Sequence, residues 1–189
     1  MPPADHSNSL DFVVQYKVFM EDSINTMASL ISSRNTSALG VELYKDLLSM
    51  NDSDIKVFIE SKRRELVKNC VIRLCAKLEW MVQTDYKKNK RKYKKKINFQ
   101  KELRNCEPQR IGESQQKIYT LDSLVKCWKA EMTLAQTDRH IGPLKRFLRY
   151  RHWLAHGEHW SEPEKCEIDE IFDKAYMAAK NFLASINIM

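Results

Sequence analysis

Residues that interrupt helices are rare along this chain. Four glycines and five prolines occur among 189 residues. Because glycine loosens a helix and proline removes one of its hydrogen-bond donors, so few of them favour long helices. Apolar residues make up 43% of the chain, which suffices for a hydrophobic core at this length. The sequence therefore predicts an all-α fold, a bundle of five to six helices forming one domain over residues 10–189.

Apolar residues recur at the three-to-four-residue spacing of amphipathic helices in six segments. They predict helices over residues 10–31, 41–48, 55–86, 121–138, 141–156 and 168–186. Asp52 or Ser53 is expected to cap the longest helix, and SEPE at 161–164 matches a capping box before the last one. Residues 1–9 are expected to form a flexible lead-in. Residues 98–116 are expected to connect two halves of the domain through a polar loop near 105–117.

A basic segment, KKNKRKYKKK at residues 87–96, holds eight positive charges, whereas the whole chain carries +7. Such a block attracts polyanions by releasing their condensed counterions. The sequence therefore predicts an RNA-binding segment, in which Tyr93 can stack on a base. A solvated helical surface or a localisation signal is the alternative. The residues predicted to bind RNA are Lys87, Lys88, Lys90, Arg91, Lys92, Tyr93, Lys94, Lys95 and Lys96.

The five cysteines form no CxxC pair and leave an odd one over, which favours reduced thiols over a secreted disulfide framework. The first residues lack the pattern of an export signal, and no run of eighteen apolar residues occurs. We therefore expect a cytoplasmic protein with no membrane association and no cofactor.

The stretch YRHWLAHGEHW at residues 150–160 holds three of the five histidines, with an arginine directly before the first. Arg151 and His152 follow Leu148 by three and four residues, which places both on or beside the buried face of the predicted helix. A guanidinium can fork onto phosphate oxygens, and an imidazole can take and give a proton near neutral pH. This pair suits the cleavage of RNA, whose 2′-hydroxyl supplies an internal nucleophile.

Two other interpretations of this cluster remain open. His152 and His156 are spaced to bind zinc from one helical face, with His159 or Cys166 completing the set, although HWLAH lacks the glutamate of HExxH peptidases. Alternatively, Arg151 pairs with an acid on the apolar stripe of the longest helix, Glu79 or Asp85, and the histidines pack against tryptophans.

The string R151-H-W-L-A-H156 resembles the R-x(4–6)-H signature of the HEPN superfamily (higher eukaryotes and prokaryotes nucleotide-binding). The wider run FLRYRHWLAHGEHW is similar to a bacterial group of that superfamily. LEWMVQTDY at residues 78–86 resembles the LE…DY element of the same group. The matching stretches cover about 25 residues.

This resemblance implies a HEPN-like helical domain that forms a homodimer with two motifs facing one cleft, acting as a metal-independent endoribonuclease. Arg151 and His156 would match its catalytic pair, His152 the intervening polar position, and Glu79 a supporting acid. A toxin or phage-defence role, with an antitoxin or regulatory protein as partner, is typical of such proteins. The alternative is a catalytically silent module that binds RNA or a partner protein.

Overall fold

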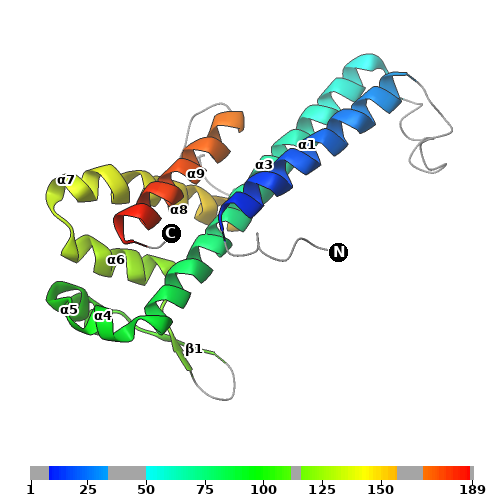
Figure 1. The fold of residues 1–189 in the computed structure, drawn as a ribbon. Helices are drawn as coiled ribbons and strands as arrows, with labels where there is room; N and C mark the ends of the chain where they lie inside the picture. The colour runs from blue at the N-terminus through cyan, green and yellow to red at the C-terminus, as the bar shows by residue number, and fades with distance from the viewer. Residues whose placement is uncertain (1–8, 34–49, 112–115, 157–167, 188–189) are drawn as a thin grey trace.

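The computed structural model describes residues 9–33, 50–111, 116–156 and 168–187. Within these ranges the chain is helical apart from one short hairpin, which confirms the predicted all-α class (Figure 1). The expected helix at 41–48, the capping box at 161–164 and all of the lead-in at 1–9 except Ser9 lie outside the described residues. No helix in the described part of the chain has the length and apolar content needed to cross a membrane. The elements are α1 (Asp11–Ser32), α3 (Asp52–Lys88), α4 (Lys90–Lys94), α5 (Ile97–Asn105), β1 (Gln109–Ile111), β2 (Gln116–Ile118), α6 (Leu121–Glu131), α7 (Leu134–Gln136), the π-helical η2 (Thr137–Ile141), α8 (Gly142–Ala155) and α9 (Ile168–Ser185).

Helix α3 is the central element, with 37 residues and a length of about 55 Å. Its cap is Asn51, not the expected Asp52 or Ser53. The Asn51 side chain accepts a hydrogen bond from the Asp54 N–H at 2.9 Å, and the Asp54 carboxylate accepts one from the Asn51 N–H at 3.4 Å. This reciprocal pair satisfies backbone donors that the first turn leaves open.

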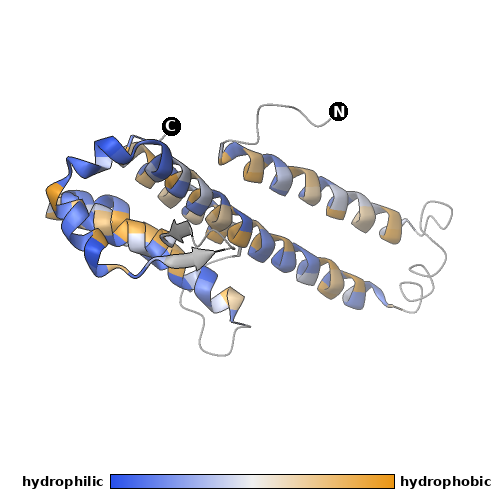
Figure 2. Ribbon diagram, turned by 90° about the horizontal axis from the view of Figure 1, so that it is seen from below, coloured by the Kyte–Doolittle hydropathy of each residue, from blue (hydrophilic) through white to orange (hydrophobic). Residues whose placement is uncertain are grey.

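Two groups of helices cover different parts of α3. Helix α1 runs antiparallel along α3 from the first half of α3 into its second half, and the two project together from the rest of the molecule (Figure 1). Hydrophobic and hydrophilic residues alternate in bands along both helices (Figure 2). Helices α6, α8 and α9 pack on α3 in the remainder of the domain. Leu74, Leu78 and Val82 of α3 are almost fully buried in the shared core.

The expected polar connection over residues 98–116 is wrong for most of its length. Helix α5 begins at Ile97 because Phe99 and Leu103, one turn apart, are buried against α6. The Glu131 carboxylate accepts a hydrogen bond from the Phe99 N–H at 2.7 Å, which satisfies a free donor in the first turn of α5. Strands β1 and β2 then pair antiparallel, with Gln109 opposite Ile118.

The predicted helix over residues 121–138 is interrupted after α6. Thr133 starts a new helix: its hydroxyl accepts a hydrogen bond from the Gln136 N–H, and the Gln136 side chain accepts one from the Thr133 N–H. The π-helical η2 follows and leads directly into α8, whose first turn contains Pro143 as expected.

An aromatic cluster holds the basic segment against the domain. The Tyr93 ring lies 4.9 Å from Phe99, 5.6 Å from Trp128 and 5.3 Å from Tyr86 between ring centroids. The Tyr93 hydroxyl donates a hydrogen bond to the Asp85 carboxylate. With 1% of its surface exposed, Tyr93 is not available to stack on a base, so that expectation is wrong.

The cations of the basic segment lie outside this cluster. All of them are exposed except Lys96, which is half-buried with its Nζ 4.7 Å from the centre of the Trp128 ring. The segment is thus a helical surface of seven exposed charges at the end of α3 and along α4.

Replacing Phe99 by alanine is expected to lower the free energy of unfolding by about 3–5 kcal/mol, because it removes a fully buried ring from the cluster. Urea denaturation followed by circular dichroism measures this change. The control is Ile97→Ala, which removes an 80% exposed side chain two residues away and is expected to cost less than about 0.5 kcal/mol. Equal effects of the two substitutions would contradict the packing of α5 described above.

Candidate functional site

The motif residues Arg151 and His152 lie near the end of α8, where both side chains are exposed. Helix α8 buries Leu144, Phe147, Tyr150 and Trp153, spaced by three residues. By helical position Arg151 and His152 flank Leu144 and Leu148, so they lie beside the buried face as expected, although both side chains are exposed near the helix end.

The two histidines of the motif contact each other. The rings of His152 and His156 are 4.1 Å apart between centroids and inclined by 61°. This contact follows from their spacing of four residues, which places them one turn apart. His156 caps the C-terminus of α8, and its N–H donates a hydrogen bond to the His152 carbonyl at 3.1 Å.

A cleft of about 590 Å³ lies between α3, α6 and α8, and three of the four predicted catalytic residues line it. Glu79 comes from α3, whereas Arg151 and His152 come from α8. The fourth residue, His156, reaches this group through its contact with His152. The described residues that line the cleft are Cys75, Glu79, Thr120, Leu121, Asp122, Lys126, Lys145, Leu148, Arg149, Arg151 and His152.

Glu79 connects α3 to the start of α6. Its Oε1 accepts a hydrogen bond from the Leu121 N–H at 3.0 Å and another from Gln83 Nε2 at 3.2 Å. Gln83 Nε2 also donates to the Tyr119 carbonyl at 3.0 Å. A half-buried acid on α3 is thus satisfied by the N–H of the first residue of α6 and by an amide one turn further along α3.

These contacts bear on the alternative in which Arg151 pairs with an acid on α3. In the described part of the chain, the hydrogen-bond donors to Glu79 are the Leu121 backbone and the Gln83 amide. Those to Asp85 are the Tyr93 hydroxyl and the Asn89 amide, the latter at 2.6 Å. Both acids thus accept their hydrogen bonds in this part of the chain from neutral groups and not from Arg151.

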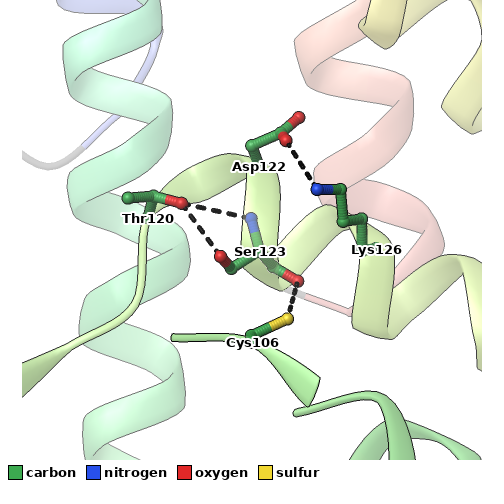
Figure 3. Close-up of polar contacts among 5 residues, drawn as sticks. All are labelled: Cys106, Thr120, Asp122, Ser123 and Lys126. Carbon is green, nitrogen blue, oxygen red and sulfur yellow. Dashed lines mark hydrogen bonds and ion pairs between the residues drawn. The ribbon is translucent and has the colours of Figure 1, made fainter. Parts of the chain in front are cut away.

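The N-terminus of α6 forms one wall of the cleft. The Thr120 hydroxyl accepts a hydrogen bond from the Ser123 N–H at 3.2 Å and so caps the helix (Figure 3). Lys126 lies one turn further on, with its Nζ 3.3 Å from the Asp122 carboxylate. The positive end of the α6 helix dipole and the Lys126 side chain therefore both lie at the cleft.

The cleft carries a surplus of positive charge. Four cations line it, namely Lys126, Lys145, Arg149 and Arg151, against two acids. Both acids already have partners, since Glu79 accepts N–H donors and Asp122 contacts Lys126. Helix N-termini and guanidinium groups bind phosphate and carboxylate oxygens. The arrangement suits an anion, and a phosphate group in particular.

Cys75 lies at the buried end of this cleft as a protonated thiol. Burial raises its pKa to about 12, and the charge of Glu79 adds to this shift, whereas the nearby charge of Arg151 opposes it. Since the thiolate is the reactive form of cysteine, Cys75 is not suited to act as a nucleophile at neutral pH.

No group of three or more metal-ligating side chains occurs among the described residues. His159 and Cys166, which would complete a zinc set with His152 and His156, lie outside those residues.

Sequence reasoning missed the cations around Arg151. The intervals from Lys145 to Arg149, to His152 and to His156 are four, three and four residues, so the four side chains form one stripe along α8. This spacing was a signal that the sequence offered. Lys126 and Thr120 gave no such signal, because they come from another helix and reach the cleft through tertiary packing.

Comparison of the chain with protein-family models, with curated proteins and with solved structures gives no match. The likeness to the HEPN superfamily therefore rests on the motif residues themselves.

Replacing Glu79 by alanine is expected to lower the free energy of unfolding by about 1–3 kcal/mol, because the Leu121 N–H loses its acceptor. Glu79→Gln should restore much of this stability, since its amide oxygen can still accept. Urea denaturation measures both. The control Glu65→Ala removes only an exposed pair with Lys62 and should cost less than about 1 kcal/mol. If Glu79→Ala costs no more than this control, Glu79 does not anchor α6.

Proposed function

We propose that this protein is a metal-independent endoribonuclease that cleaves RNA in the cleft between α3, α6 and α8. The observation that carries the proposal is the convergence of Arg151 and His152 with Lys126, Lys145 and Arg149 beside the N-terminus of α6. Such a set of donors fits the backbone of a polyanion, and the adjacent imidazoles supply groups that transfer protons.

The proposed reaction begins with the 2′-hydroxyl of the RNA. One imidazole removes its proton while the 2′-oxygen forms a bond to phosphorus, and the bond from phosphorus to the 5′-oxygen breaks. The departing 5′-oxygen takes a proton from a second group, which acts as a general acid. The products are a 2′,3′-cyclic phosphate and a 5′-hydroxyl. His156 serves as the general acid or base, and His152 contacts its ring.

Arg151 binds the phosphate oxygens in this scheme and stabilises the charge that builds up at phosphorus. Arg151 and His156 are five residues apart, or about 140° around a helix. In the proposed homodimer, Arg151 of one chain acts with His156 of the other, so this angle does not prevent them from meeting. The toxin or phage-defence setting, with an antitoxin or regulatory protein as partner, is proposed on the resemblance of the motif.

The basic segment at residues 87–96 is proposed to bind the RNA outside the cleft. Lys87 lies eight residues after Glu79 on the same helix, which is about 12 Å along its axis. The exposed cations there attract the backbone through counterion release, without preference for sequence.

A catalytically silent module that binds RNA or a partner protein is the second candidate. One observation favours it: His156 is not among the described residues that line the cleft. In this case the cleft binds phosphates without positioning a general acid or base for the reaction.

Cleavage of cellular RNA in EDTA, with analysis of the product ends, tests the proposal. The wild type is expected to yield 2′,3′-cyclic phosphates, and Arg151→Ala and His156→Ala are each expected to slow cleavage by about 100-fold or more. The control Arg64→Ala removes an exposed arginine of α3, paired with Glu60, and should leave the rate unchanged.

A folded wild type that binds RNA but does not cut it would favour the silent module. Loss of cell toxicity in His156→Ala, with unchanged expression, would support the ribonuclease in vivo.

A further inference from the structure

A second groove, of about 390 Å³, lies between the beginning of α1 and the second half of α3. Three aromatic side chains line it, Phe12 and Tyr16 from α1 and Trp80 from α3. Two cations of α3, Arg73 and Lys77, lie among them. On α3, the groove residues occupy the same turns as the cleft residues Cys75 and Glu79. The two sets point roughly 130° apart around the helix axis.

The aromatic rings and cations of the groove are arranged in pairs. The Arg73 guanidinium lies 4.3 Å from the centre of the Tyr16 ring, and Lys77 Nζ lies 4.4 Å from the centre of the Trp80 ring. These contacts hold the long cationic side chains beside the rings. Phe12 and Trp80 nevertheless remain 46% exposed, so ring surface is open to a ligand.

The combination of open rings and positive charge selects a ligand that is both aromatic and anionic. Bases stack on aromatic side chains, and lysine and arginine bind the phosphates between them. Stacking of this kind requires unpaired bases, because the faces of paired bases are covered by their neighbours in the duplex. No acid lines the groove among the described residues, so nothing there repels a phosphate.

We infer that this groove binds an unpaired stretch of nucleic acid, with bases on Phe12 and Trp80 and phosphates on Arg73 and Lys77. The inference does not depend on cleavage in the other cleft, since it concerns binding alone. A second copy of the chain is a poorer occupant, because a two-fold contact centred on this groove would bring Arg73 and Lys77 toward the same cations of its partner.

The test uses a fluorescent single strand of twelve 2′-O-methyl nucleotides, which lacks the nucleophile for cleavage, and measures its affinity by anisotropy. Trp80→Ala is expected to weaken binding by about 5- to 100-fold. Arg73→Gln and Lys77→Gln are each expected to reduce the slope of log affinity against log salt by about 0.7. Phe19→Ala, which removes a 67% exposed ring elsewhere on α1, should leave the affinity unchanged.

The same strand annealed to its complement separates stacking from charge. Its affinity should not respond to Trp80→Ala, because its bases are paired. An unchanged single-strand affinity in Trp80→Ala would overturn the inference, and so would an equal loss for the duplex.

Two further outcomes would assign the groove to a protein. If Trp80→Ala has a lower molecular mass than the wild type in light scattering, the groove binds a second copy of the chain. If the wild type binds polyglutamate and Trp80→Ala does not, the groove binds an acidic protein. If the wild type cuts no RNA but Trp80→Ala still weakens single-strand binding, the result supports the binding groove and contradicts the proposed ribonuclease.

Discussion

The hydrogen bond from the Leu121 N–H to the Glu79 carboxylate fixes where the cleft forms. It joins the second half of the longest helix to the first turn of α6, and Gln83 strengthens the connection through the Tyr119 carbonyl. With α6 held there, its N-terminus and Lys126 face the end of α8 across the cleft. Arg151 and His152 can then lie outside the core and still meet a positive surface. Glu79 thus has a positioning role that explains why an acid lies on an apolar stripe.

Positive charge is distributed around the second half of α3 in three places. The cleft on one side gathers cations from α6 and α8, the basic segment at residues 87–96 extends the surface beyond the end of α3, and the groove beside Trp80 lies on another side. All three surfaces include residues of this one helix, namely Glu79 in the cleft, Trp80 in the groove and Lys87 in the basic segment. A flexible polyanion is the kind of ligand that can contact them together. This shared geometry links the proposed cleavage to the proposed binding groove.

The sequence predicted those parts of the fold in which one helix carries the whole signal. The apolar spacing located α1, α3, α8 and α9, and the motif placed His152 and His156 one turn apart. The prediction from sequence was wrong where a contact depends on a segment far away in the chain. Phe99 and Leu103 have the spacing of one helical turn, but they lie in a short and mostly polar segment, and its helix is stabilised by Trp128 and Glu131 of α6. The lysines around Tyr93 predict an exposed ring, but the aromatic cluster buries it.

The most direct test of the central claim, that RNA phosphates bind in the cleft beside the paired imidazoles, is a nuclear magnetic resonance titration of protein labelled with ¹³C at histidine Cε1. The ligand is a 2′-O-methyl single strand, which cannot be cut. The signals of His152 and His156 are expected to shift on saturation, whereas that of His140 on η2, whose Nδ1 is buried, should not. Tight binding that leaves the His152 and His156 signals unmoved would contradict the account, because the RNA would then lie away from these residues.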